Sequence, residues 1–154
     1  MNLRKAALPD IDLLTRLRLD YLAAEGGPIP EEDRKSLEKQ LPAYFTKHLA
    51  DGSFIGILAE IDGVVVSAAF LAISEKPANL AFMTGRTGTL LNVLTYPAYR
   101  RQGIATKVLE RLLAEAKGAG VASVDLLATE DGKSVYEKIG FAESAYTYMR
   151  KRLL

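Results

Sequence analysis

Residues 88–117 read GTLLNVLTYPAYRRQGIATKVLERLLAEAK, and this stretch decides the fold class. Residues 88–95 are apolar on both faces of an extended chain, which predicts a strand in the centre of a sheet. Pro97 ends this strand. From residue 103 to about 117, apolar side chains recur every three or four positions, which predicts a long amphipathic helix. A strand, a turn and a helix in this order indicate an α/β domain.

The turn before this helix has the features of an anion-binding site. A helix N-terminus leaves backbone amides unpaired and carries a partial positive charge, so a diphosphate binds well there. Gly103 allows the backbone to approach a ligand closely, and Ala105 keeps the next turn narrow. Arg100 and Arg101 add positive charge, and Gln102 adds an amide donor. We therefore interpret residues 100–105 as a phosphate cradle.

The rest of the chain supplies further strands and helices. Asp62-Gly63 lies between two apolar runs and predicts a hairpin, because both positions of its turn need a positive φ. Pro42 falls inside a helical pattern and is expected to kink or split that helix. We expect strands over 2–8, 53–61, 64–73, 121–128 and, once or twice, 141–153, and helices over 9–24, 31–48 and 131–139.

Composition excludes several kinds of site. The chain of 154 residues has no cysteine and one histidine, His48, so disulfides, thiolate metal sites and multi-histidine metal sites are excluded. The net charge of +1 gives no reason to expect nucleic acid as a partner. The first residues, MNLRKAALPD, contain no apolar core of a secretory signal, and no apolar run reaches the length of a membrane span. We therefore expect one cytoplasmic domain without metal, nucleic acid or membrane.

Three segments together resemble one protein family. YPAYRRQGIATKVLERLLAEA (96–116) is similar to the central motif of the GNAT (GCN5-related N-acetyltransferase) family, which binds the pyrophosphate of acetyl-CoA. LLATEDGKSVYEKIGFAES (126–144) resembles the family segment that packs against the pantetheine arm. RKAALPDIDLLTRLRLDYL (4–22) resembles the opening strand and helix. The resemblance therefore covers nearly the whole chain.

The resemblance implies a fold and a cosubstrate. It implies a single domain over 1–154, with a mixed, mostly antiparallel sheet flanked by helices and a V-shaped splay between strands 88–95 and 121–128. The pantetheine arm of acetyl-CoA would lie in this splay and bond the backbone as an incomplete strand does. The cofactor-binding residues implied in this way are Val93, Leu94, Thr95, Arg100, Arg101, Gln102, Gly103, Ile104, Ala105, Thr106 and Thr129.

The resemblance also implies a proton donor, Tyr136, which would protonate the leaving thiolate of coenzyme A. From periodicity alone, Tyr136 reads as a core aromatic of a short helix. Thr129 stands where relatives often carry an asparagine that bonds the pantetheine. Asn92 stands on the central strand where many relatives carry an acidic base. Asn92 cannot act as a base, but it could orient a water or the acceptor amine, or it could be a hydrogen-bonded strand residue.

The general base therefore stays open. A free alkyl amine has a pKa of about 10.4, so it needs a base or a lowered pKa to attack at neutral pH. Glu60, Glu75 and Glu130 are the candidate bases, and His48 is better explained as a surface or packing residue. The acidic pair Glu130-Asp131 either attracts a cationic acceptor or simply starts a helix.

Two functions of different classes follow from these features. The first is an acetyl-CoA-dependent N-acetyltransferase that moves an acetyl group to a primary amine of a small molecule, amino acid or peptide by direct attack. The second is a catalytically weak GNAT-fold module that binds acyl-CoA and senses or regulates. A nucleotide-binding domain of another kind is disfavoured, because G-x-G-x-x-G and the P-loop pattern are both absent. The closing segment 146–149 could pair across a homodimer or finish the sheet within one chain.

Overall fold

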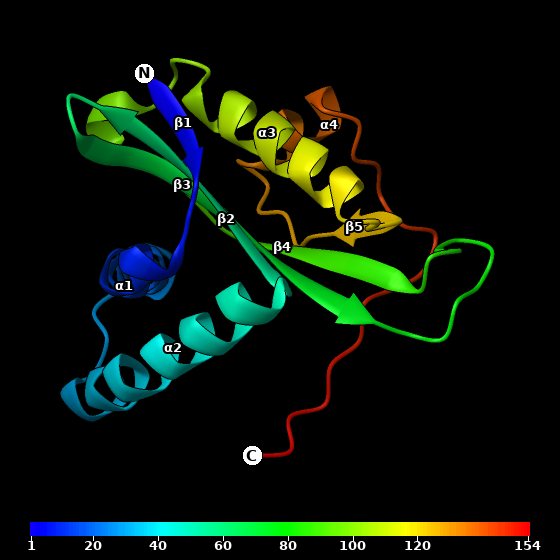
Figure 1. The fold of residues 1–154 in the computed structure, drawn as a ribbon, viewed down its shortest axis with the longest axis horizontal. Helices are drawn as coiled ribbons and strands as arrows, with labels where there is room; N and C mark the ends of the chain where they lie inside the picture. The colour runs from blue at the N-terminus through cyan, green and yellow to red at the C-terminus, as the bar shows by residue number, and fades with distance from the viewer.

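The computed structural model describes residues 1–154, and Figure 1 shows one sheet crossing the molecule with helices on both of its sides. Helices and strands alternate after an antiparallel centre, as expected of an α/β domain. In chain order the elements are β1 (Asn2–Lys5), the 3-10 turn η1 (Leu8–Asp10), α1 (Ile11–Gly26), α2 (Glu31–Asp51), β2 (Phe54–Ile61), β3 (Val64–Glu75), β4 (Arg86–Thr95), the 3-10 turn η2 (Pro97–Tyr99), α3 (Ile104–Gly118), β5 (Ser123–Asp125) and α4 (Lys133–Lys138).

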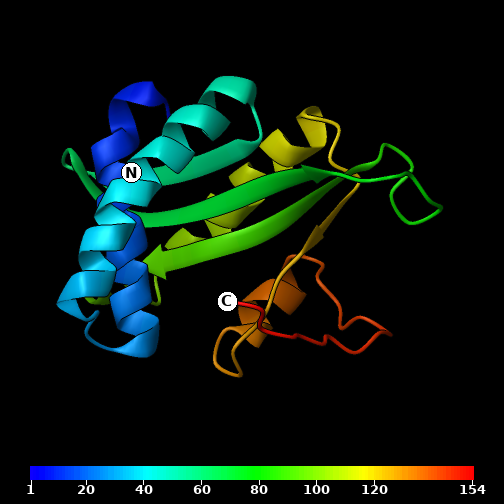
Figure 2. The ribbon, with the colours of Figure 1, turned by 90° about the horizontal axis from the view of Figure 1, so that it is seen from below.

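The strands form one sheet in the order β1-β2-β3-β4-β5. Strands β1 to β4 are antiparallel to their neighbours, and β5 is parallel to β4, so the predicted mixed, mostly antiparallel sheet is confirmed. Pairing between β4 and β5 is limited to residues 87–89 and 123–125. Beyond them the chain leaves the sheet towards α4, as Figure 2 shows along the lower edge of β4. The edge of β4 is therefore open along residues 90–95, where no strand pairs with it. This opening corresponds to the splay expected between strands 88–95 and 121–128.

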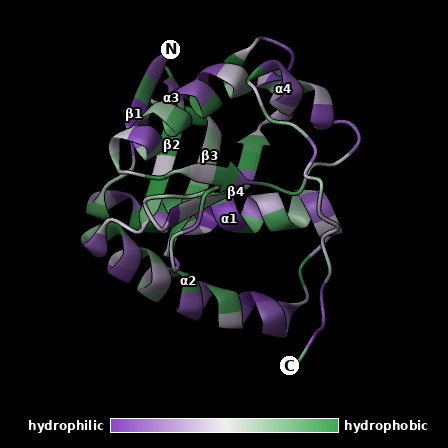
Figure 3. Ribbon diagram, turned by 90° about the vertical axis from the view of Figure 1, so that its right-hand side faces the viewer, coloured by the Kyte–Doolittle hydropathy of each residue, from purple (hydrophilic) through white to green (hydrophobic).

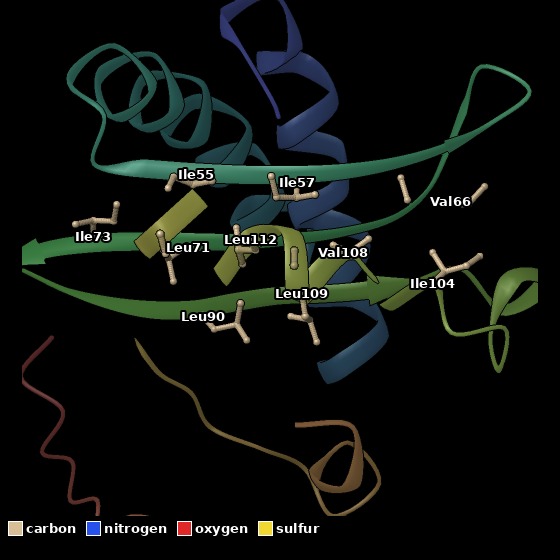
Figure 4. Packing of buried hydrophobic residues seen from close by; sticks show 13 residues of the cluster. Ile55, Ile57, Val66, Leu71, Ile73, Leu90, Ile104, Val108, Leu109 and Leu112 are labelled. Atoms are coloured by element: carbon tan, nitrogen blue, oxygen red, sulfur yellow. The ribbon is translucent and has the colours of Figure 1, made fainter. Parts of the chain in front are cut away.

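Helices cover both faces of the sheet. Helix α3 packs Val108, Leu109 and Leu112 onto one face, where each is no more than 1% exposed. Figure 4 shows these side chains meeting Ile57 and Leu71 from the strands. Burial of each such side chain contributes about 1.5–3 kcal/mol. In Figure 3 the strands are mostly hydrophobic, whereas the helices carry hydrophilic residues over much of their surface.

Helices α1 and α2 cover the opposite face. Phe45 of α2 packs edge-on against Phe54 and Phe70, with ring centroids 5.1 and 5.9 Å apart. Such edge-to-face pairs are favoured by the ring quadrupoles. Helix α2 continues through Pro42, so the expected split is wrong; Leu41 and Phe45 on either side of it are both buried, and this packing offsets the lost hydrogen bond. None of the helices combines the length and apolarity that a transmembrane segment requires.

The hairpin between β2 and β3 is confirmed. Asp62 and Gly63 form its turn with φ values of 51° and 77°, as a two-residue hairpin turn requires. Its flanking strands pair from Ile61 and Val64 outward. The dipeptide Asp62-Gly63 was sufficient to predict this hairpin, because the geometry of its turn depends on these two adjacent residues.

The end of the chain differs from the expectation. The strand expected over 121–128 is reduced to Ser123–Asp125, and residues 141–154 form no strand. A strand needs a neighbour to satisfy its backbone groups, and β5 leaves the sheet before the closing segment could join it. Tyr146 and Met149 are accordingly 89% and 86% exposed. The alternating pattern of this segment favours a strand, but the segment pairs with no other strand, and propensity alone does not form one.

An ion-pair network joins β1, η1 and β2. Arg4 donates from Nη1 and Nη2 to both carboxylate oxygens of Asp10, each at 2.8 Å, and from Nε to Glu60 at 2.7 Å. The guanidinium holds the pKa of Asp10 below its usual range. The network therefore ties the N-terminal strand to the body of the sheet.

Replacing Arg4 by Ala is expected to lower the free energy of unfolding by about 2 kcal/mol at neutral pH. Because Asp10 has a lowered pKa, the contribution is complete above a pH of about 4 and disappears as the pH falls through the folded pKa. Urea unfolding at pH 7 and pH 3 measures both effects. Arg34→Ala breaks an exposed pair with Glu38 and should cost no more than about 0.5 kcal/mol. Equal losses for the two variants would contradict the prediction.

Candidate functional site

The open edge of β4 begins at a bulge. Ala68 of β3 pairs with Leu94 and Phe70 pairs with Leu91, so β4 holds one extra residue between these pairs. Asn92 takes up this bulge with a φ of 56°, a conformation that asparagine tolerates better than most residues. The bulge bends β4, and bulges of this kind are common next to active sites.

Asn92 is turned into the protein, towards α1. Its side chain is 1% exposed, and Nδ2 donates to the Leu17 carbonyl oxygen at 3.4 Å. Its Oδ1 is the buried side-chain atom that has no hydrogen-bond partner. A buried acceptor without a partner costs free energy, so it marks a place where a further donor is wanted. The structure thus places Asn92 between the bulge and α1.

The backbone of β4 directs alternate residues towards the open edge. The Leu94 carbonyl accepts from Ser67 Oγ at 2.9 Å, and the Tyr96 amide donates to Val66 on the β3 side. Because successive residues of a strand point their backbone groups in opposite directions, Val93 and Thr95 face the open edge. The Leu94 backbone faces β3 instead. Of the three strand residues expected to bind the cofactor, Val93 and Thr95 are the ones whose amides face outward.

The turn into α3 presents a row of free amides. The first intrahelical bond runs from the Lys107 amide to the Gly103 carbonyl at 3.3 Å, and no amide from 101 to 106 is bonded to the protein. Arg101 and Gly103 have φ values of 61° and 75°. Left-handed residues in such a turn let successive amides point into one concavity that suits an anion. Ile104 is buried below them, whereas Ala105 and Thr106 are half-buried.

The polar side chains of this turn differ in their roles. Arg100 donates from Nε to the Thr95 carbonyl at 2.9 Å, so it fixes the turn to the end of β4. Gln102 donates to the Ala98 carbonyl at 3.4 Å. Arg101 is exposed and has no partner in the protein. Arg101 is therefore the cationic side chain of the cradle that is free to meet a ligand.

Tyr136 lies in α4 beyond the open edge of β4. It is half-buried and packs edge-on against Phe141, with ring centroids 6.0 Å apart. Burial raises its pKa, and the nearby Tyr21 and Glu25 raise it further. A raised pKa keeps the phenol protonated at neutral pH, so Tyr136 holds a proton that it can donate.

Helix α1 supplies residues that the sequence analysis did not select. Tyr21 and Glu25 are close enough to Tyr136 to affect its pKa, although they lie more than a hundred positions away in the chain. Asp20, next to Tyr21, accepts a 2.5 Å hydrogen bond from the Tyr96 hydroxyl, and with burial this raises the pKa of Tyr96 to about 12. Residues 18, 21 and 25 recur at helical spacing and therefore share one face of α1. This spacing does not show which other element that face contacts.

Two of the candidate bases are paired away from the open edge of β4. Glu60 pairs with Arg4, and Glu75 pairs with Arg86 at 3.0 Å at the far end of the β3–β4 hairpin. His48 contacts Ser53 through Nδ1 at 2.5 Å and stacks on Tyr44. His48 is therefore a packing residue, as expected. Glu130 is exposed in the loop before α4.

Thr129 closes the loop that leads into α4. Its Oγ1 accepts from the Gly132 amide at 3.2 Å, and its carbonyl accepts from the Lys133 amide at 3.1 Å. The hydroxyl hydrogen remains free to donate. Thr129 therefore positions α4, and it can still offer one donor to a ligand.

Two further features bear on the type of site. No three His, Asp or Glu side chains gather closely enough to hold a metal ion. A shallow hollow of about 590 Å³ lies beside η1 at the β1 side of the sheet, lined largely by apolar side chains, with Lys5 as its only charged residue. None of the predicted catalytic or cofactor-binding residues lines this hollow. The open edge of β4 is therefore the candidate active site.

Comparison with known proteins identifies the family. The model of the "Acetyltransferase (GNAT) family" matches residues 14–141. A protein of Clostridium acetobutylicum, described as a predicted acetyltransferase with acetyl-CoA, is 34% identical with a TM-score of 0.85, over 97% of this chain and 95% of that one. A GCN5-related N-acetyltransferase of Ralstonia eutropha JMP134 is 24% identical and shares the fold, with a TM-score of 0.81 over 97% of both chains.

Glucosamine 6-phosphate N-acetyltransferase 1 of rice (Oryza sativa subsp. japonica) is 29% identical over 119 residues, which cover 75% of this chain and 66% of the rice protein. The match thus spans just under two thirds of the rice relative. The family model covers most of the chain, and the bacterial relative aligns with it nearly from end to end. On these grounds the chain belongs to the acetyltransferase (GNAT) family.

Proposed function

We propose that this protein is an acetyl-CoA-dependent N-acetyltransferase that acts on a primary amine by direct attack. The observation that carries the proposal is the junction of an open strand edge with the unbonded amides of residues 101–106. An anion fits the amides, and an extended chain with amide groups fits the edge. Acetyl-CoA has both parts in this order, and it supplies the thioester carbonyl that the amine attacks.

The cradle residues hold the diphosphate. The amides of Gln102, Gly103, Ile104, Ala105 and Thr106 donate to its oxygens, and the Arg101 side chain adds a formal charge. Arg100 keeps the turn attached to Thr95, so its role is to position the cradle.

The strand edge holds the pantetheine arm. Val93 and Thr95 present the outward backbone groups, and Thr129 offers its hydroxyl from the opposite side. The Leu94 carbonyl is occupied by Ser67, so Leu94 contributes packing.

Tyr136 supplies the proton for the leaving group. The amine nitrogen forms a bond to the thioester carbon, the carbon–sulfur bond breaks, and the thiolate takes the phenolic proton. The amine loses one proton to solvent, and solvent returns a proton to Tyr136. Because its pKa is raised above the usual value of about 10, Tyr136 is protonated throughout the physiological range.

Asn92 is proposed as a residue that orients the acceptor side of the site. Its Nδ2 holds α1 on the bulge through Leu17, and its unpaired Oδ1 accepts from a water or from the acceptor amine. An amide cannot remove a proton at neutral pH. Asn92 therefore does not take up the proton of the attacking amine.

The rate is expected to follow the ionisation of the acceptor amine. With an alkyl amine, kcat/KM should rise about tenfold per pH unit up to about pH 10, because only the neutral amine attacks. No descending limb should appear below pH 10, since the raised pKa of Tyr136 keeps its proton in place. Initial rates from pH 6 to pH 10, with coenzyme A release followed by a thiol reagent, measure this profile. A plateau from about pH 7 would indicate a base that the present assignment lacks.

A second candidate function is an acyl-CoA-binding sensor. It is favoured by the absence of a carboxylate on the open edge of β4, since Glu60 and Glu75 are paired elsewhere. The two functions are separated by incubating the protein with acetyl-CoA and a panel of amines, amino acids and peptides, including glucosamine 6-phosphate. Release of coenzyme A above background supports the enzyme. Tight binding of coenzyme A without release on any acceptor supports the sensor.

A further inference from the structure

Arg18 stands apart from the other partly buried arginines. Arg4, Arg86 and Arg111 each pair with a carboxylate. Arg18 makes no ion pair and no hydrogen bond, although its burial lowers its pKa. Its guanidinium lies 5.8 Å from the ring centroid of Tyr21. Arg18 therefore keeps its hydrogen-bond donors free for a group from outside the protein.

The nitrogens of Arg18 can be reached from solvent. The buried side-chain atom without a partner is Asn92 Oδ1, so none of the Arg18 nitrogens is both buried and unbonded. Burial lowers the pKa of Arg18, Tyr21 and Tyr44 raise it, and no carboxylate acts on it. A guanidinium whose N–H groups are unbonded offers several donors in a small space. Carboxylates and phosphates are bound in this way, often by two parallel hydrogen bonds.

This group of residues adjoins the proposed active site. Helix α1 lies on β4, and Leu17, next to Arg18, receives the Asn92 bond at the bulge. The Arg18 guanidinium lies 5.8 Å from the Tyr21 ring centroid, and Tyr21 is one of the residues that raise the pKa of Tyr136. Tyr21 thus connects Arg18 to the proton donor.

Glu25 is a second charged residue of α1, one that lies further along the helix than Arg18. It is exposed, has no ion-pair partner and lies near Tyr136. Arg18 and Glu25 are seven positions apart, which is about 10 Å along an α-helix. A positive group and a negative group therefore lie about 10 Å apart on this face of α1. A small molecule with an amine at one end and an anion at the other matches this arrangement.

We propose that Arg18 binds an anionic group of the acceptor, so that the acceptors are small amines carrying a carboxylate or a phosphate. Glu25 attracts the ammonium end and leaves it near Tyr136. The proposal rests on the acetyltransferase function proposed above. It adds the chemical class of the acceptor and the residue that selects it.

The test compares Arg18→Gln and Arg18→Lys with the wild type on matched acceptors. Glucosamine 6-phosphate is compared with glucosamine, and β-alanine with propylamine, which separates phosphate from carboxylate recognition. The wild type should prefer the anionic member of at least one pair by roughly tenfold or more in kcat/KM. Arg18→Gln should remove that preference, mainly by raising KM, and leave neutral amines within about twofold. Arg18→Lys should retain part of the preference, because lysine keeps the positive charge but lacks the forked geometry of the guanidinium.

Arg111→Gln is the matched control. Arg111 lies on α3, on the other face of the sheet, and pairs with Glu115 at 2.9 Å. This variant removes the same charge and should keep the preference of the wild type. Equal losses on neutral and anionic amines in Arg18→Gln, or the same change in Arg111→Gln, would overturn the proposal.

Binding separates a failure of this inference from a failure of the proposed function. With coenzyme A present, titration calorimetry measures the Kd of glucosamine 6-phosphate and of β-alanine for the wild type and Arg18→Gln. Binding of an anionic amine that weakens roughly tenfold or more in the variant supports Arg18 even if no acetyl transfer occurs. Acetyl transfer with no difference between the members of either pair would overturn the inference and leave the enzyme function intact. Thermal unfolding of both variants checks that they are folded.

Discussion

Replacing Tyr136 by Phe is expected to lower kcat by roughly 10²- to 10⁴-fold while the Kd for coenzyme A stays within about twofold. The substitution removes the phenolic oxygen and keeps the ring, which packs on Phe141 at 6.0 Å between centroids. The packing of α4 should therefore survive. What is lost is the phenolic proton that the thiolate takes up.

The matched control is Tyr146→Phe. Tyr146 is 89% exposed and lies in the closing segment, so removal of its hydroxyl should leave kcat unchanged. Steady-state rates at saturating acetyl-CoA, with coenzyme A binding by calorimetry, measure both variants. If Tyr136→Phe keeps the wild-type kcat, another group or water protonates the thiolate.

A valine at Gly103 is expected to raise the Kd for acetyl-CoA by roughly 10- to 100-fold. Gly103 has a φ of 75°, and an L-residue in this conformation costs about 1–2 kcal/mol. A Cβ at this position meets no protein atom within 4 Å, so the added side chain would occupy space outside the protein, in front of the free amides. It would keep a diphosphate from approaching them.

Gly63→Val separates strain from obstruction. Gly63 has a φ of 77° and also has no atom within 4 Å of an added Cβ, but it lies in the β2–β3 hairpin. The two variants should lose similar amounts of unfolding free energy, and the Gly103 variant alone should lose acetyl-CoA affinity. Thermal unfolding and calorimetry provide these values. Equal affinity in the two variants would show that the amides of residues 101–106 are not the diphosphate site.

The largest part of the fold was predictable because its signals are local. The helical spacing from Ile104 onward predicts α3, and residues that repeat every three or four positions must share a face. Asp62-Gly63 predicts the hairpin for the same kind of reason. The motif around Gly103 and the segment around Tyr136 indicated the family, and the match over residues 14–141 confirms it.

The errors concern segments whose conformation depends on a neighbour. The residues expected to continue β5 and to close the sheet have strand-like patterns, but in the structure they pair with no strand. Pro42 was expected to interrupt α2, yet the burial of Leu41 and Phe45 keeps the helix continuous. In both cases tertiary contacts decide between conformations that local preference leaves nearly equal.

The sequence by itself determined the types of the elements up to α3, the turn at residues 101–106 and the family, because each of these depends on residues close together in the chain. Tertiary structure alone decided what surrounds Tyr136. Tyr21 and Glu25 act on its pKa from α1, which is bonded to the bulge of β4 through Leu17, and Arg18 on the same helix has no carboxylate partner. The charge and burial of a site depend on which elements, far apart in the sequence, come together there. The order of residues in the chain does not give the distances between these elements in space.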